Sequence, residues 1–270
     1  GYYIASVSDS IFLHPMGGME FKGLAAEVLY YKDFQEEYGF KMEVVRHGKY
    51  KSAVEPYLES EMSEANRTQI FSLLNSVWEN ISETIATGRN LTTTQLNEIA
   101  NGLKATQPEH AQANGLIDAL AYESDYDDKL KNALGIESDS RLKTVSIGQL
   151  TAGNGLAKKG VRERIAVIYA QGPVLYGEGS ENIIGQEVFL KAIDQAVKSR
   201  RVKAIVLRVD SPGGSALSSD IIWKALVKAK KEKPLVVSMG NVAASGGYYL
   251  AVAGDEIYAN DMTITGSIGV

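Results

Sequence analysis

The sequence predicts an α/β fold built on a largely parallel β-sheet, and three observations support this. From residue 165 onward, apolar runs of strand length alternate with amphipathic segments of helical length, which is the pattern of right-handed βαβ units. Hydrophobic residues make up 44% of the 270 residues, enough for a large core and for roughly two domains. Residues 1–16 (GYYIASVSDSIFLHPM) are also nearly repeated as residues 247–262 (GYYLAVAGDEIYANDM), at a constant offset of 246, a period that is domain-sized and too long for a solenoid unit.

The first part of the chain is predicted to be mainly helical. In order, the expected elements are a helix over 25–38 closed by Gly39, a short strand over 42–46, a long helix over 63–87, a helix over 93–103, and a polar helix that follows residues 111–120 and ends near Gly135. Ser63 is the expected N-cap of the long helix, and Gly88 its expected end. The apolar stripe of this helix comprises Ile70, Leu73, Leu74, Val77, Trp78, Ile81 and Ile85.

The second part carries the alternating strands and helices. Residues 136–164 are polar and glycine-bearing without sustained periodicity, so we interpret them as an interdomain connection. The elements expected after it are a strand over 165–170, a helix over 186–198, a strand over 203–209, a helix over 216–230 and a strand over 235–239.

Composition excludes several function classes. The net charge of -5 provides no basic surface for nucleic acid. No apolar run approaches the roughly 20 residues that cross a bilayer, and the absence of cysteine excludes disulfides and a thiol nucleophile.

Two loops at successive strand ends are the candidate site. The first, Asp210-Ser-Pro-Gly-Gly-Ser215, has paired glycines, Gly213 and Gly214, whose bare backbone N–H groups can approach a ligand as an oxyanion hole does. The second, within residues 240–249, displays Ser245 between small neighbours before a run that can start a helix. Chemistry in an open α/β sheet gathers at the carboxyl ends of strands, although a Pro-Gly-Gly loop alone is more often just a turn, and a serine among small residues is more often a sign of close packing.

A serine nucleophile needs a base. The three histidines are His14, His47 and His110; His47, beside Gly48 at a strand end, is the least implausible of them. Lysine is the alternative when burial or a neighbouring charge favours its neutral amine, and Lys51 stands after a predicted strand and before an apolar pair. Taken alone, Lys51 is more typical of an exposed loop lysine.

Four motifs together resemble the signal peptide peptidase A (protease IV) family of serine peptidases, in its long, internally duplicated form. They are YKSAVEP (50–56), RVDSPGGSA (208–216), VSMGNVAASGGYY (237–249) and TGSIGV (265–270). The resemblance implies that Ser245 is the nucleophile and Lys51 the general base, with Gly213, Gly214 and Gly246 at the oxyanion hole. Residues 111–120 (AQANGLIDAL) are similar to a helix-end segment of the wider ClpP/crotonase superfamily, which implies a spiral of ββα units in tandem domains.

The resemblance also implies a domain plan and a mechanism. Residues 1–135 would be the C-terminal part of the amino-terminal repeat and supply Lys51, and residues 165–270 would be the N-terminal part of the carboxy-terminal repeat and supply Ser245. The chemistry would be acyl transfer by a Ser-Lys dyad without metal or cofactor, with Ser52 or Ser267 holding the lysine amine.

The implied substrates are cleaved signal peptides and similar apolar peptides. The implied assembly is a homo-oligomer, with a tetramer as the expected number, whose subunits are anchored to the cytoplasmic membrane outside this segment and carry the catalytic part on the periplasmic or extracytoplasmic side. Whether Lys51 meets Ser245 within one chain or across a subunit boundary is left open by the sequence.

Three alternatives remain at this point. A duplicated domain without chemistry would explain the repeat alone. A crotonase-like acyl-CoA lyase or hydratase would share the glycine amides but use acids, of which Asp210 and Glu55 are nearest the motifs. A non-catalytic scaffold or pseudoprotease would keep the fold without the reaction.

Overall fold

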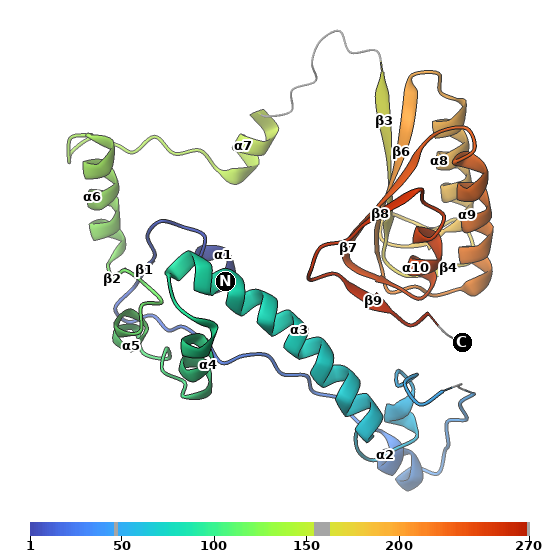
Figure 1. The fold of residues 1–270 in the computed structure, drawn as a ribbon, viewed down its shortest axis with the longest axis horizontal. Helices are drawn as coiled ribbons and strands as arrows, with labels where there is room; N and C mark the ends of the chain where they lie inside the picture. Colours follow the sequence, from blue (N-terminus) through green and yellow to red (C-terminus); the bar gives the residue numbers. More distant parts are fainter. Residues whose placement is uncertain (46–47, 154–162, 269–270) are drawn as a thin grey trace. The chain divides into compact units, whose positions relative to one another are not determined.

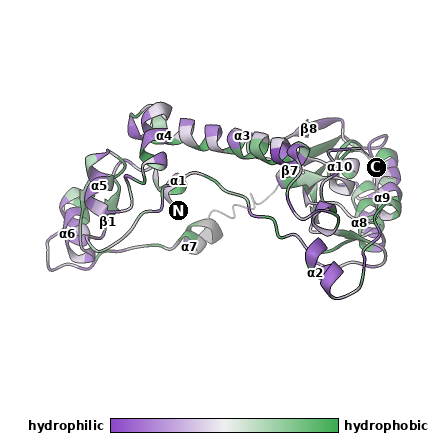
Figure 2. Cartoon of the chain, turned by 90° about the horizontal axis from the view of Figure 1, so that it is seen from below, coloured by the Kyte–Doolittle hydropathy of each residue, from purple (hydrophilic) through white to green (hydrophobic). Residues whose placement is uncertain are grey.

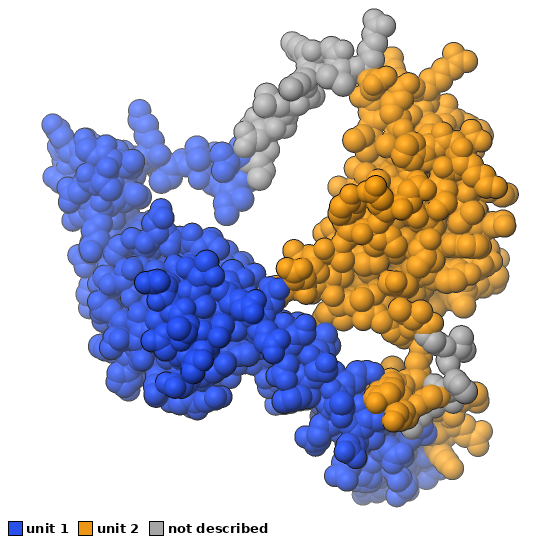
Figure 3. Space-filling model, in the orientation of Figure 1, with its two compact units in different colours: residues 1–40, 55–156 blue, residues 41–54, 157–270 orange. Residues whose placement is uncertain are grey.

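A computed structural model of the chain describes residues 1–45, 48–153 and 163–268. It divides into two compact units, coloured separately in Figure 3. Unit 1 comprises Gly1–Phe40 and Glu55–Leu156, and unit 2 comprises Lys41–Val54 and Ala157–Val270. The segment that contains Lys51 therefore groups with the strands of the second part of the chain. The division into repeats at residues 135 and 165 stays a prediction.

Unit 2 is built on a five-stranded sheet in which every pair of strands is parallel. The strands follow the order β3 (Arg164–Gln171), β6 (Val202–Ser211), β7 (Leu235–Ala244) and β8 (Glu256–Tyr258). Strand β9 (Ile264–Gly266) also pairs with β7, but with its last residues, after the stretch that pairs with β8. Helices α8 (Gln186–Lys198) and α9 (Ala216–Ala229) connect these strands and lie side by side next to the sheet (Figure 1). The predicted α/β class is confirmed, and the predicted bounds of α8 are those observed.

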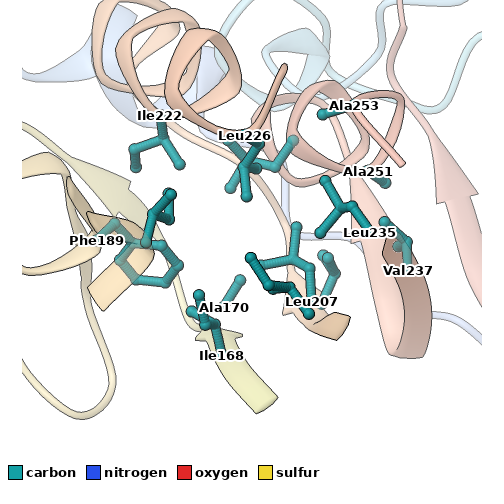
Figure 4. Close-up of a cluster of buried hydrophobic side chains, with 14 of the residues drawn as sticks. Ile168, Ala170, Phe189, Leu207, Ile222, Leu226, Leu235, Val237, Ala251 and Ala253 are labelled. Atoms are coloured by element: carbon teal, nitrogen blue, oxygen red, sulfur yellow. The ribbon is translucent and has the colours of Figure 1, made fainter. Parts of the chain in front are cut away.

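The core of unit 2 lies between these helices and the sheet. Figure 4 shows Ile222 and Leu226 of α9 above Leu207 of β6, and all three side chains are fully buried. Alternate residues of β6 point into this layer because strand side chains alternate between faces, and full burial of each such side chain stabilises the fold by ~1.5–3 kcal/mol.

The chain passes through a second, smaller sheet between strand and helix. Short strands β4 (Val174–Leu175) and β5 (Ile184–Gly185) pair in parallel, and Val174 also bridges to Gly214. After β3 the chain runs through β4 before α8, and after β6 it runs through Gly214 before α9. The first turn therefore follows the strand, strand, helix path of the ββα spiral that the resemblance implied, and in the second turn the single bridging residue Gly214 stands in the place of the second strand.

Unit 1 is mainly helical, as predicted. Its elements are α1 (Tyr2–Ala5), β1 (Phe12–Leu13), α2 (Lys32–Glu37), the 3-10 helix η1 (Glu55–Tyr57), α3 (Glu64–Arg89), α4 (Thr93–Asn101), α5 (Pro108–Ala113), β2 (Ala119–Leu120), α6 (Glu123–Leu134) and α7 (Ile147–Gly153). In unit 2, helix α10 (Gly246–Ala251) precedes β8 just as α1 precedes β1 in unit 1. The two copies of the GYY segment thus share a local order of a short helix followed by a short strand.

Helix α3 begins as predicted and ends later. The Ser63 side chain accepts a hydrogen bond from the Asn66 N–H, so Ser63 is the N-cap. The helix continues past Gly88 to Arg89 and ends at Asn90, which adopts a left-handed conformation (φ 53). Gly88 instead allows the backbone of Ser6 to pack closely against α3, because a Cβ at residue 88 would lie 2.4 Å from the carbonyl oxygen of Ser6.

The predicted apolar stripe of α3 is buried only toward its C-terminal end. Hydrophobic and hydrophilic residues alternate along the helix (Figure 2). Ile85 is 1% exposed within the core of unit 1, whereas Leu73 is 40% exposed. The amphipathic pattern therefore predicted the helix correctly but not how much of its apolar face is covered.

Several predicted bounds were wrong for identifiable reasons. The predicted helix over 25–38 shrinks to α2, because the Tyr31 N–H bonds the carbonyl of Pro56 before α2 begins. Residues 42–45 form no strand, and Arg46 lies outside the described residues. Helix α7 falls inside the predicted connection. Strand β7 continues five residues beyond the predicted end because β9 pairs with its last residues.

In the part of the chain that the structure describes, we find no helix with both the length and the hydrophobicity of a membrane span.

Candidate active site

Ser245 stands at the turn between β7 and α10. Its backbone adopts φ 49 and ψ -121, a region that a residue with a side chain rarely occupies. The Ser245 N–H donates to the Gly266 carbonyl at 3.0 Å, and its own carbonyl accepts from the Tyr249 N–H at 2.9 Å. The pairing of β7 with β9 on one side and the first turn of α10 on the other therefore hold this strained residue in place.

A cleft of about 560 Å³ opens beside Ser245. Its wall consists of Ser245 and Ser267, the backbone of Gly214 and Gly246, the polar Ser219 and Asp220 of α9, and the largely apolar Ala216, Tyr248, Tyr249, Val252 and Ile268. A cleft of this size and character suits an apolar side chain presented next to a hydroxyl.

The glycine turn after β6 packs directly against Ser245. Gly213 and Gly214 have positive φ angles of 94 and 149. A Cβ on Gly213 would lie 2.5 Å from Gly246 N and 2.6 Å from Ser245 Cβ. A Cβ on Gly246 would lie 3.3 Å from Gly214 N. Only glycine therefore fits at Gly213, and the backbones that carry the Gly214 and Gly246 amides lie together at the cleft wall.

The three predicted oxyanion glycines are not equivalent. The Gly213 N–H donates to Ser211 Oγ at 3.1 Å, and the Gly213 carbonyl accepts from the Val174 N–H at 2.8 Å. Both hydrogen-bonding groups of Gly213 are thus engaged within the turn. Gly214 and Gly246, unlike Gly213, line the cleft.

Lys51 lies in the same unit as Ser245 and is half-buried. Its Nζ donates a hydrogen bond of 2.8 Å to Ser267 Oγ. Ser267 follows β9 directly, with φ 51, and the residue before it, Gly266, accepts the Ser245 N–H. Of the two serines predicted to support the lysine, Ser267 therefore contacts it, while the role of half-buried Ser52 stays a prediction.

The remaining predicted residues have structural contacts. His47 lies outside the described residues. Asp210 accepts a hydrogen bond from the Val242 N–H at 3.0 Å, which joins β6 to β7. Glu55 is 1% exposed and sits in unit 1, where it accepts hydrogen bonds from the backbone and side chain of Ser63 and from Asn66. Burial acts to raise the pKa of Glu55, but these hydrogen bonds outweigh it and the pKa lies below its usual value. Both acids are thus engaged in hydrogen bonds that hold the fold together.

Sequence reasoning missed three residues around the cleft. Ser211 was read only as part of the loop. Asp220 and Tyr249 were not singled out, yet the Tyr249 hydroxyl donates to Asp220 Oδ1 at 2.9 Å, and this hydrogen bond raises the pKa of Tyr249. The sequence did contain a clue to Asp220: the predicted helix that becomes α9 begins directly after the glycine turn, so its first residues were expected to lie near that loop.

Comparison with known proteins identifies the family. Residues 1–137 and 227–270 match peptidase family S49. The chain is 34% identical over 279 residues to Protease 4 of Haemophilus influenzae and 35% identical over 278 residues to Protease 4 of Salmonella typhi. It is 32% identical over 277 residues to the chloroplastic serine protease SPPA of Arabidopsis thaliana. All of this chain is covered in each case, but only 45%, 44% and 40% of the relatives.

Solved structures give a partial likeness. A mutant of the 1510-N membrane-bound stomatin-specific protease aligns with a TM-score of 0.28 at 18% identity, covering 36% of this chain and 44% of that one. An enoyl-CoA hydratase/isomerase family member aligns with a TM-score of 0.27 at 18% identity, covering 34% and 45%. The chain thus spans less than half the length of the curated relatives it matches, and the family match, which extends over more than half of its residues, places it as a member of peptidase family S49.

Proposed function

We propose that this chain carries the catalytic centre of a serine peptidase in which Ser245 is the nucleophile and Lys51 the general base. The observation that carries the proposal is the 2.8 Å hydrogen bond from Lys51 Nζ to Ser267 Oγ, on a cleft that Ser245 and Ser267 both line. This brings an amine, the nucleophilic serine and two glycine amides to one small region of unit 2. Membership of a peptidase family supports the same conclusion.

The proposed reaction is acyl transfer. The Lys51 amine takes the proton of the Ser245 hydroxyl as Ser245 Oγ attacks the scissile carbonyl carbon, and the carbonyl oxygen becomes an oxyanion. The N–H groups of Gly214 and Gly246 stabilise that oxyanion, each contributing about 3–4 kcal/mol. The C–N bond then breaks, and the leaving amine receives the proton from the Lys51 ammonium. Water hydrolyses the acyl-enzyme by the same steps, with Lys51 again as base.

Ser267 has a defined part in this scheme. An amine on a four-carbon stem has many rotamers, and the base must stay oriented toward the nucleophile. By accepting one N–H of Lys51, Ser267 limits those rotamers. The segment that holds Ser267 is itself fixed to Ser245 through the hydrogen bond between Ser245 and Gly266.

The proposed substrates are released signal peptides and similar apolar peptides. The cleft supports this class, because Tyr248, Val252 and Ile268 give it an apolar wall beside Ser245, while the small residues around Ser245 leave room for a peptide backbone.

We also propose a homo-oligomer, expected as a tetramer, anchored to the cytoplasmic membrane outside this segment with the catalytic part on the extracytoplasmic side. An exposed aromatic cluster around α2 supports self-association. Phe34 and Tyr38 have ring centroids 4.6 Å apart and are 51% and 68% exposed, and exposed aromatic groups of this kind are typical of interfaces.

The experiment is cleavage of a fluorogenic apolar peptide by the full-length protein, combined with labelling by a serine-reactive phosphonate. Ser245→Ala and Lys51→Met should each lower kcat by at least ~10³-fold. Lys49→Met is the matched control, because Lys49 contacts the Tyr50 ring and should leave the rate unchanged. Normal cleavage by Lys51→Met, or labelling of a residue other than Ser245, would refute the assignment. A wild-type protein that neither cleaves nor is labelled would point to a scaffold.

A further inference from the structure

We propose that Ser211 is a positioning residue for the oxyanion site: its hydroxyl fixes the glycine turn so that the Gly214 N–H faces the cleft. The inference rests on the proposed peptidase function. Ser211 is the last residue of β6 and is 0% exposed. Its Oγ donates to the Gly172 carbonyl at 2.7 Å and accepts from the Gly213 N–H at 3.1 Å. One hydroxyl therefore ties the turn after β3 to the turn after β6.

The glycine turn depends on such contacts because it has no side chains of its own. Two successive glycines leave the backbone with more conformational freedom than any other pair of residues. Two peptide planes meet at the Gly213 Cα, and each is held by one hydrogen bond. Ser211 Oγ holds the plane that contains the Gly213 N–H, and the Val174 N–H holds the plane that contains the Gly213 carbonyl. Together these two bonds set the conformation of Gly213, whose φ is 94.

The direction of the Gly214 N–H follows from this arrangement. The Gly213 carbonyl and the Gly214 N–H belong to one trans peptide and point in opposite directions. Because the carbonyl points at Val174 of β4, the N–H points away from β4, on the side where Gly214 lines the cleft. If the Gly213 N–H lost its hydrogen bond to Ser211, the backbone at Gly213 could rotate and the Gly214 N–H would no longer point toward the cleft.

Ser211 also contacts the second amide-bearing segment. A Cβ on Gly247 would lie 2.7 Å from Ser211 O and 2.9 Å from Ser211 Cβ, so the first turn of α10 packs directly on Ser211. The Gly246 amide belongs to that same turn. Ser211 thus touches both segments that supply proposed oxyanion donors, yet it does not line the cleft, so a substrate does not reach it. Its effect should fall on kcat and not on KM.

The test uses the full-length protein and two independent readouts: kcat and KM with the apolar peptide, and hydrogen exchange of the Gly213 amide by NMR. Ser211→Ala removes the hydroxyl, and Ser211→Cys removes it while keeping most of the volume. Both variants should lower kcat by about 10- to 100-fold, which is less than the loss of a whole oxyanion donor causes, and should keep KM within about threefold of the wild type. Both should also speed the exchange of the Gly213 N–H. Ser211→Thr keeps the hydroxyl and should retain most of the wild-type kcat and most of the protection of the Gly213 N–H from exchange.

Ser218→Ala is the matched control. Ser218 is equally buried, but its hydroxyl bonds Gln186 and Ser215 and not the glycine turn amide. It should change neither kcat nor Gly213 exchange. The inference fails if Ser211→Ala and Ser211→Cys keep wild-type kcat and Gly213 protection, or if Ser218→Ala lowers kcat equally. A wild-type protein without activity would overturn the proposed function alone, because Gly213 exchange still tests the role of Ser211.

Discussion

Replacing Gly214 with alanine should remove catalysis while leaving unit 2 folded. The added Cβ would lie 2.2 Å from Val174 O and 3.0 Å from Val174 C and N. These are backbone atoms of β4, which cannot turn aside as the end of a side chain can. To reach ordinary contact at 3.4 Å the turn must move by 1.2 Å relative to β4. It would carry the Gly214 N–H away from the proposed oxyanion position.

The size of the effect follows from the geometry. Loss of one oxyanion donor lowers kcat by about 10²–10³-fold, or ~2.7–4 kcal/mol, and a misplacement of about 1 Å is enough to lose it. The matched control is Gly177→Ala in the same unit. Gly177 has φ 120 but nothing within 4 Å of an added Cβ, so it takes the strain of a left-handed alanine, roughly 1–2 kcal/mol, without the collision.

The assay is steady-state cleavage of an apolar peptide together with thermal unfolding. Gly177→Ala should keep kcat and lose a few degrees of Tm, whereas Gly214→Ala should lose kcat and show a larger fall in Tm, because the collision with Val174 adds to the backbone strain. If Gly214→Ala kept kcat within about threefold of the wild type, the proposed oxyanion site would be wrong. An equal loss in Gly177→Ala would show that backbone strain, and not the position of Gly214, is responsible.

Three further predictions test the base, a buried acid and the core. Ser267→Ala should lower kcat about 10-fold or more because Lys51 loses the acceptor of its 2.8 Å hydrogen bond, and wild-type kinetics would contradict the role of Ser267. The pKa of Glu55 lies below its ordinary 4.5, so the wild type should have a larger free energy of unfolding than Glu55→Gln at neutral pH, and this difference should shrink as the pH falls through the folded-state pKa. Urea unfolding at about pH 7 and about pH 3 measures the difference. A difference that stays constant between the two would refute the prediction. Leu226→Ala should cost ~2–5 kcal/mol of unfolding free energy and Leu217→Ala, 60% exposed on the same helix, well under 1 kcal/mol, so similar losses would contradict the core assignment.

The fold of unit 2 could be predicted where local pattern and packing agree. Helix α8 was predicted with its observed bounds because the residues spaced for one helical face, Phe189 and Ile193, are those buried in the core. Strands β8 and β9 were missed because nearly all their side chains are exposed and carry no period-two pattern. They exist through pairing with β7, which local sequence does not encode.

The candidate site divides in the same way. Ser245 and the glycine turn were found because both follow strands, and strand ends in a parallel sheet share an edge. The contact between Lys51 and Ser267 spans 216 residues, and no local rule reaches that far. The local setting of Lys51 drew attention to it, but its assignment as the base came from the resemblance. Ser211 was missed because its proposed role depends on its hydrogen bond with the Gly213 N–H. The direction of that N–H is set by the folded turn and cannot be read from the sequence.

The duplicated segment shows how the two copies have diverged at this site. Extended five residues beyond residue 16, the offset of 246 pairs Phe21 with Ser267. In unit 1, Phe21 is 7% exposed. Its ring packs edge-on against Tyr2, with centroids 5.8 Å apart, and at a tilt against Trp78, with centroids 5.5 Å apart. In unit 2, Ser267 lies at the cleft and accepts from Lys51. A buried phenyl ring cannot hold a lysine amine, and a serine at residue 21 would leave a cavity in the core of unit 1. The two copies therefore use this position differently, for packing in the first and for contact with Lys51 in the second, as the proposed catalytic centre drawn from both copies predicts.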